Sequence, residues 1–218
     1  MIKAIIFDLD GTLLNSTKDI ANSLNKVLKD NNQKTYTLKE IEKFLGYGSY
    51  NLIKDTLPKN SSKELIDKVY NEYINYYPKN SNIYTKPYDG INELINKLKE
   101  ENYKIAIASN KMNNAVVKLN IEKFDNKFDI AVGESELLKV KPNPDMILHV
   151  INELNLTKDE VLFIGDTEVD LNAAKNANVK NVAVTWGFRD KEFLINERPT
   201  HIIDKPSELL KILNNYKN

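Results

Sequence analysis

The sequence predicts an α/β protein with a doubly wound parallel sheet, into which an all-helical segment is inserted after the first strand. Two observations support this. From about residue 83 to the end, short apolar runs typical of strands alternate with helical patterns, which indicates a parallel sheet covered on both faces. Residues 16–82 contain helical patterns and no convincing strand, although a strand-like run precedes them at residues 2–8.

The run at residues 2–8 is apolar without alternation, as buried parallel strands are. A single strand cannot form a sheet, so it is expected to pair with strands from beyond residue 100. Residues 1–15 and 83–218 are therefore predicted to form one core domain, and residues 16–82 an inserted cap domain. Because the insert begins shortly after Asp10, we expect the cap to cover that end of the sheet as a mobile lid.

Each remaining element is predicted from apolar spacing or from a short apolar run. The first helix of the insert should run from Ser16 to about Lys29, with Asn15, Ser16 or Thr17 as its N-cap. Three further helical patterns follow in the insert, at 38–45, 52–57 and 65–77. In the core, strands are expected at 103–109, 128–132, 161–164, 182–186 and 201–203, and helices at 91–98, 113–119, 144–154, 170–177 and 206–216.

Composition excludes several classes of function. Lys plus Arg and Asp plus Glu balance at 31 each, so there is no basic surface for nucleic acid or for an anionic membrane. The chain has no cysteine, which excludes disulfides and thiolate chemistry. The apolar run before Asp8 is too short for a signal sequence or a membrane span. We expect a cytoplasmic protein that is a monomer or a homodimer.

Two carboxylates follow the first strand directly. Asp8 and Asp10 are two residues apart, and side chains at that spacing on a strand point to the same face. Like charges this close repel each other unless a cation or a shared proton relieves them. The pair is also what a simple Asx turn before glycine requires, so its meaning depends on the rest of the chain.

Three other polar segments also stand at or just after the ends of predicted strands. The four together are Asp8 to Thr12, Ser109-Asn110, Lys141 to Pro144 and Gly165 to Asp170. In a doubly wound sheet, ligands bind outside the carboxyl ends of the strands, where the strand order reverses. If the first and fourth strands are neighbours there, Asp8, Asp10 and Asp166 converge.

The residue types in these segments agree on one chemistry. Three carboxylates without a histidine or cysteine cluster suit a hard cation, Mg²⁺ above all. Hydroxyl groups and a lysine can hold a phosphoryl group, and Gly11 lets backbone N–H groups approach an anion. A carboxylate beside Mg²⁺ can attack phosphorus, and a second carboxyl group can protonate the leaving group. The sequence therefore predicts phosphoryl chemistry.

In order and spacing, the four segments resemble the four motifs of the haloacid dehalogenase-like hydrolase superfamily, in particular its phosphatases with a helical cap. The resemblance implies a Rossmann-like core and a role for each motif residue. Asp8 is then the nucleophile, and Asp10 the acid/base that also binds Mg²⁺ through its backbone carbonyl. Asp166 completes the metal ligands, and Asp170 supports the metal waters or Lys141.

For phosphate, the resemblance implies Ser109 and Lys141 as the main ligands. Gly11, Thr12 and Asn110 would assist them. Asp170 could equally be only a charge at a helix N-terminus. Glu168 is expected to be solvated.

The cap loop Phe44-Leu45-Gly46-Tyr47-Gly48 resembles the glycine-containing loop of phosphoglycolate phosphatases and their pyrophosphatase relatives. It marks Gly46, Tyr47 and Gly48 as candidate substrate contacts, although glycines here also suit the end of a helix. The segment from Thr185 to Arg189 resembles the same group. The tyrosines at 70, 73, 76 and 77 have helical spacing and are expected to pack inside the cap.

The favoured function is a Mg²⁺-dependent phosphatase that acts through an aspartyl-phosphate, with 2-phosphoglycolate as the substrate. Inorganic pyrophosphatase and β-phosphoglucomutase-like activities on the same scaffold stay open. A non-enzymatic alternative is a receiver-like switch in which phospho-Asp8 carries a signal, but such a switch needs neither Asp10 nor a cap. A haloacid dehalogenase would not require Asp10 and the metal set.

Overall fold

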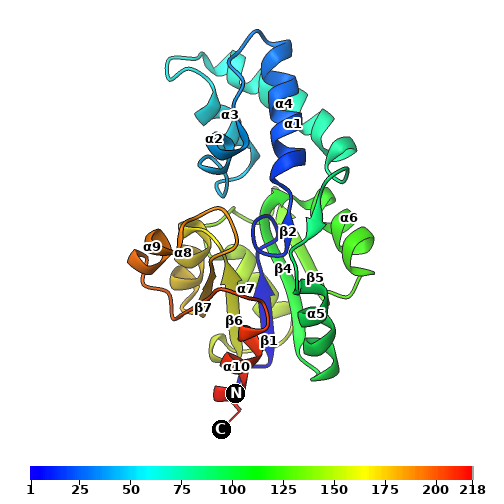
Figure 1. The fold of residues 1–218 in the computed structure, drawn as a ribbon, viewed down its shortest axis with the longest axis vertical. Coiled ribbons are helices and arrows are strands. Elements are labelled where there is room, and N and C mark those ends of the chain that lie inside the picture. The colour runs from blue at the N-terminus through cyan, green and yellow to red at the C-terminus, as the bar shows by residue number, and fades with distance from the viewer. Residues whose placement is uncertain (218) are drawn as a thin grey trace.

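The computed structural model describes residues 1–217 and contains a six-stranded parallel sheet in the order β5-β4-β1-β6-β7-β8 (Figure 1). Its strands are β1 (Ala4–Phe7), β4 (Lys104–Met112), β5 (Ile130–Glu134), β6 (Val161–Gly165), β7 (Lys180–Val184) and β8 (His201–Ile203). All five pairings between neighbours are parallel. The doubly wound α/β class predicted from the sequence is confirmed.

The strand order reverses beside β1. After β1 the chain builds β4 and β5 on one side, then returns to build β6, β7 and β8 on the other. Phe7, the last residue of β1, is in register with Ile107 of β4 and with Ile164 of β6. The residues that follow these three positions therefore meet at one edge of the sheet, where doubly wound proteins bind their ligands.

Helices cover both faces of the sheet. Alternate residues of β1 contribute to two separate apolar cores: Ile5 and Phe7 to one, Ala4 and Ile6 to the other. The first core is closed by α5 (Ile91–Glu100), α6 (Asn113–Phe124) and α10 (Glu208–Asn215), and the second by α7 (Asp145–Glu153) and α8 (Glu168–Ala177). This two-sided burial explains why β1 is apolar at every position.

Residues 16–82 form four helices and no strand, at the top of Figure 1. They are α1 (Thr17–Asp30), α2 (Leu38–Glu42), α3 (Ser49–Thr56) and α4 (Lys63–Asn80). Their apolar faces share a core of their own, which includes Leu24, Ile53 and Val69. We call these four helices the cap; the domain boundaries at residues 15 and 83 stay a prediction. No helix in the described chain is long and apolar enough to span a bilayer.

Two connections join the cap to the core, and hydrogen bonds hold them together. The strands β2 (Leu14–Asn15) and β3 (Lys86–Pro87) form a short antiparallel ribbon. Next to it, the buried carboxylate of Asp19 accepts hydrogen bonds from the backbone N–H of Tyr84 at 2.9 Å and of Thr85 at 2.8 Å, and from the Thr85 hydroxyl at 2.7 Å. Asp19 thus holds the returning connection against the first turn of α1.

We expect Asp19→Ala to lower the free energy of unfolding by about 2–4 kcal/mol, because it leaves the buried N–H and hydroxyl of Thr85 and the part-buried N–H of Tyr84 without their acceptor. Urea denaturation monitored by circular dichroism measures the change. Asp30→Ala at the exposed end of the same helix is the matched control and should cost less than about 1 kcal/mol. Equal midpoints for the two variants would contradict this role of Asp19.

Several element boundaries differ from those predicted. β4 extends to Met112 rather than ending at Ser109, and α6 runs five residues further than expected, to Phe124. The short helix α9 (Lys191–Asn196) was not predicted, since its six residues are too few to display a helical period. The ends of such elements depend on tertiary contacts that local patterns do not contain.

Candidate active site

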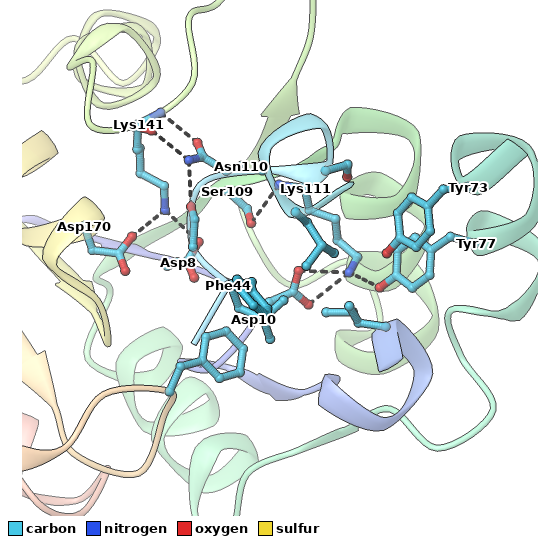
Figure 2. A pocket seen from close by; sticks show the side chains of 17 residues that line it. Asp8, Asp10, Phe44, Tyr73, Tyr77, Ser109, Asn110, Lys111, Lys141 and Asp170 are labelled. Carbon is cyan, nitrogen blue, oxygen red and sulfur yellow. Dashed lines mark hydrogen bonds and ion pairs between the residues drawn. The ribbon is translucent and has the colours of Figure 1, made fainter. Parts of the chain in front are cut away.

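The centre of the site is a buried lysine between two carboxylates. The Lys141 ammonium donates to Oδ1 of Asp8 at 2.6 Å and to Oδ1 of Asp170 at 2.6 Å. Asp8 follows β1, Asp170 lies in the first turn of α8, and Lys141 lies in the loop before α7 (Figure 2). The other oxygen of Asp170 accepts hydrogen bonds from the Thr167 backbone N–H and hydroxyl. Asp170 therefore caps the N-terminus of α8 and also holds Lys141 in place. Capping and support of the site are therefore combined in one residue.

Asp166 lies beside this pair and is fully buried. Its carboxylate accepts from the Thr12 hydroxyl at 2.7 Å and from the Phe188 backbone N–H at 2.8 Å. Gly11 passes so close that a Cβ there would lie 2.3 Å from Oδ2 of Asp166, and its φ of +92° is in the left-handed region. Glycine is required at position 11 to let the first loop reach the carboxylate.

The carboxylates of Asp8, Asp166 and Asp170 offer oxygens that lie within 4.8 Å of one another. Burial raises the pKa of Asp8 to about 7 even though Lys141 opposes the shift. Burial, followed by the charges of Asp170 and Asp8, also raises the pKa of Asp166. Three buried carboxylates against one ammonium leave an excess of negative charge, and oxygen ligands of this kind fit a hard divalent cation. The donor set therefore suits a metal ion.

Asp10 points away from the three clustered carboxylates, toward the cap. Both of its oxygens accept from the ammonium of Lys111, at 3.0 and 2.9 Å. The same ammonium contacts the hydroxyl of Tyr77 on α4. Lys111 was not predicted as a site residue. Tyr73 and Tyr77 pack in the apolar core of the cap, as predicted, and they also line the site (Figure 2).

The sequence holds only a partial signal for Lys111, which lies two residues after Ser109, a spacing that puts side chains on one face of a regular strand. The predicted strand ends at Ser109, and β4 is irregular between Ala108 and Met112, so alternation alone does not place Lys111. The contact with Tyr77 has no local signal, since the two residues are 34 positions apart in the chain.

Ser109 and Asn110 follow the regular part of β4 but do different things. Ser109 is buried and lines the cavity, with its hydroxyl accepting from the Lys111 backbone N–H at 3.3 Å. The Asn110 amide donates to the backbone carbonyls of Gly46 at 2.9 Å and Lys141 at 2.8 Å, and accepts from the Lys141 N–H at 2.7 Å. Both of its N–H donors are used, so the Asn110 side chain holds the Lys141 loop and the cap, and its predicted role at the phosphate stays a prediction.

Two other predicted contact residues, Thr12 and Tyr47, lie outside the cavity lining, and their contacts with substrate stay predictions. The Thr12 side chain is fully buried and donates to Asp166, and it does not line the cavity. Tyr47 is 39% exposed and does not line it either. Gly46 and Gly48 do line the cavity.

Glu168, which the sequence suggested is solvated, makes a two-pronged pair with Arg189. Its oxygens accept from the guanidinium at 2.7 and 3.0 Å. The same guanidinium donates to the backbone carbonyls of Glu42 at 3.1 Å and Leu45 at 3.0 Å in the cap. Glu168 supplies the negative charge that balances the Arg189 guanidinium, which connects the core to the cap.

A cavity of about 60 Å³ lies between the cap and the carboxyl ends of the strands. Its core side is polar, formed by Asp8, Asp10, Ser109, Lys111 and Lys141. Its cap side is largely apolar, and the residues that form it include Ile20, Phe44, Leu45 and Leu52, with Phe188 from the core. The site offers a charged end to one part of a small ligand and excludes water on the other side.

Known proteins resemble the chain over nearly its whole length. A phosphoglycolate phosphatase from Aquifex aeolicus is 33% identical over 99% of this chain and 98% of its own length. A pyrophosphatase PpaX from Listeria monocytogenes is 30% identical over 97% of this chain and 96% of its own. A solved structure from Lactobacillus delbrueckii subsp. bulgaricus, provisionally assigned as a phosphoglycolate phosphatase, has a TM-score of 0.91 at 30% identity, covering 95% of this chain and 96% of that one.

The family model described as haloacid dehalogenase-like hydrolase matches residues 5–184, which include all four strand-end segments. A haloacid dehalogenase-like family hydrolase from Streptococcus pneumoniae has the same fold, with a TM-score of 0.87 at 27% identity over 97% of this chain and 98% of that one. By its sequence, its strand order and its buried acidic site, this chain belongs to the haloacid dehalogenase-like hydrolases.

Proposed function

We propose that the protein is a Mg²⁺-dependent phosphatase that hydrolyses a small phosphorylated metabolite through a phosphorylated Asp8. The observation that carries this proposal is the geometry around Asp8. Its carboxylate lies at the switch point of the sheet, 2.6 Å from a buried ammonium and clustered with two more carboxylates. A carboxylate placed in this way can attack phosphorus, since phosphoryl transfer depends mainly on positioning and on electrostatic stabilisation.

The reaction has two halves. In the first, a carboxylate oxygen of Asp8 forms a bond to phosphorus, the bond to the leaving oxygen breaks, and Asp10 gives that oxygen a proton. In the second, Asp10 takes a proton from water, the water oxygen bonds to phosphorus, and the bond to Asp8 breaks to release phosphate. Lys141 and Ser109 bind the phosphoryl oxygens throughout.

Asp8, Asp166 and the backbone carbonyl of Asp10 are the proposed ligands of Mg²⁺. When bound, the ion neutralises the phosphoryl oxygens and Asp8, so that the two anions can approach. Asp170 acts through Lys141, whose ammonium lies 2.6 Å from Asp170 and 2.6 Å from Asp8. The oxygen-only donor set favours Mg²⁺ over metals that prefer nitrogen or sulfur.

The leading substrate is 2-phosphoglycolate. A relative named for this activity covers the chain almost completely. Inorganic pyrophosphate is the second candidate, because several relatives of similar identity carry the name pyrophosphatase PpaX. A β-phosphoglucomutase-like activity would need a site that also accepts a sugar.

The proposal is tested by steady-state hydrolysis of p-nitrophenyl phosphate, 2-phosphoglycolate, pyrophosphate and β-glucose 1-phosphate, with and without Mg²⁺. We expect turnover that EDTA reduces by about 100-fold or more and that added Mg²⁺ restores, because the carboxylates then lose their neutralising charge. Mg²⁺ should also raise the melting temperature of the protein, and this rise should be lost in Asp166→Asn.

Glu136→Gln, an exposed carboxylate in the loop after β5, is the matched control and should keep both the activity and the thermal shift. Full turnover in EDTA would overturn the metal requirement. Preference for β-glucose 1-phosphate would overturn the choice of substrate and leave the reaction intact.

A further inference from the structure

The cavity contains a second cation that the proposed reaction does not use. Of the residues that line it, all within the described chain, two are cationic: Lys141 and Lys111. Lys141 is committed to Asp8 and Asp170, where the phosphoryl group binds. Figure 2 shows Lys111 on the other side of the pocket, with Asp10 and Tyr77. The two ammonium groups therefore serve opposite ends of the site.

Lys111 lies where the leaving group must lie. Asp10, the proposed proton donor to the leaving oxygen, is bonded to the Lys111 ammonium through both of its oxygens. A group that receives its proton from Asp10 is therefore within reach of Lys111 as well. Tyr77 supports the ammonium from the cap side, so the charge stands at the boundary between the core and the cap.

The environment makes this charge effective. The Lys111 side chain is 3% exposed and contacts Tyr77, and the cavity that it lines is also lined by the buried, largely apolar residues Tyr73, Ile20 and Leu52. A charge shielded from water interacts more strongly with an ion of opposite sign. The Lys111 ammonium donates one hydrogen bond to each oxygen of Asp10. A single one of these bonds is enough to keep the ion pair together, so the other N–H donor can bind a ligand instead. A buried cation with a donor to exchange recognises an anionic group.

We propose that Lys111 selects substrates whose leaving group carries its own negative charge, either a carboxylate or a second phosphoryl group. This inference rests on the proposed phosphatase function and adds the substrate class. It explains how one site can resemble both phosphoglycolate phosphatases and pyrophosphatases, because glycolate and phosphate are both anionic leaving groups. The ammonium binds the leaving-group anion while Asp10 protonates its bridging oxygen.

The test compares matched substrates with anionic and neutral leaving groups. For wild type and Lys111→Met, kcat/KM is measured for 2-phosphoglycolate, for pyrophosphate and for 2-hydroxyethyl phosphate, in which a neutral hydroxymethyl group replaces the carboxylate. The ratio of kcat/KM for each anionic substrate to that for 2-hydroxyethyl phosphate removes any general effect on Asp10. In Lys111→Met we expect this ratio to fall by about 30-fold for at least one of the anionic substrates, which is the loss of one charged hydrogen bond.

Which ratio falls identifies the anion: 2-phosphoglycolate alone indicates a carboxylate, and pyrophosphate alone a phosphoryl group. Unchanged ratios for both would overturn the proposal, even if all rates fell together, because Lys111 would then act only on Asp10. Lys111→Gln, which keeps a hydrogen-bond donor beside Asp10 and Tyr77, must show the same loss of selectivity. Lys118→Met on the exposed face of α6 is the control and should leave every ratio unchanged.

Binding separates this inference from the phosphatase proposal. Calorimetric titration of Asp8→Asn protein with 2-phosphoglycolate, pyrophosphate and 2-hydroxyethyl phosphate needs no turnover. If the wild type hydrolysed no phosphate ester, the phosphatase proposal would fail, and tighter binding of either anionic ligand that disappears with Lys111→Met would still support the role of Lys111. Equal affinities of all three ligands in both backgrounds would overturn it.

Discussion

Asp8→Asn should abolish turnover of every phosphate ester, with kcat reduced by about 10⁴-fold or more. An amide oxygen is a poor nucleophile, and the covalent route through residue 8 closes. The folded structure should persist, because Lys141 keeps its 2.6 Å bond to Asp170. Steady-state kinetics with p-nitrophenyl phosphate and Mg²⁺ measures the loss, and thermal denaturation verifies the fold.

Asp55→Asn, an exposed carboxylate on α3, makes the same chemical change away from the site and should keep full activity. When the wild-type reaction is quenched rapidly in acid during turnover, mass spectrometry should detect a phosphoryl adduct on the peptide that contains Asp8. Substantial turnover by Asp8→Asn would assign the attack to another group, such as a water molecule.

Lys141→Met should combine a large loss of activity with a loss of stability. The variant removes the ammonium that binds Asp8 and Asp170 and leaves three carboxylates buried together. We expect kcat/KM to fall by about 10³-fold, as when a preorganised charge is removed from a transition state. Without metal, unfolding free energy should fall by about 3–5 kcal/mol, the usual result of breaking a buried ion pair from one side.

Mg²⁺ should recover part of that stability, because it supplies positive charge to the same carboxylates. Chemical denaturation with and without Mg²⁺ measures both effects. Lys139→Met, two residues earlier and exposed, is the control and should change neither quantity. A Lys141→Met protein as stable as wild type in EDTA would mean that the carboxylates do not repel one another in the free protein.

The sheet and the position of the site could be predicted because both follow from local patterns. Apolar runs define β1, β4 and β6, and parallel pairing then brings their carboxyl ends to one edge. Asp8 and Asp166 lie directly after two of these ends. The correct strand order is enough to predict that Asp8 and Asp166 lie close together, because the register of β1 with β6 places their carboxyl ends side by side.

The partners of the polar side chains could not be predicted in the same way. A threonine hydroxyl or an asparagine amide can bind phosphate, but it can equally bind a neighbouring loop, and residue type does not decide between these. The Thr12 hydroxyl donates to Asp166, and the Asn110 amide donates to the carbonyls of Lys141 and Gly46. The bond between Lys111 and Tyr77 depends on how the cap closes on the core, which no pattern along the chain records.

The loop from Glu42 to Gly46 accepts hydrogen bonds from the core through its main chain, while Phe44 and Leu45 share an apolar cluster with Phe188 of the core. Asn110 and Arg189 donate to the carbonyl oxygens of Gly46, Glu42 and Leu45, not to their side chains. Main-chain carbonyls do not change when residues mutate. The cap can therefore vary the side chains that meet the substrate while its seat on the core is preserved, so new specificities can evolve, or be grafted from relatives, without rebuilding the catalytic half of the enzyme.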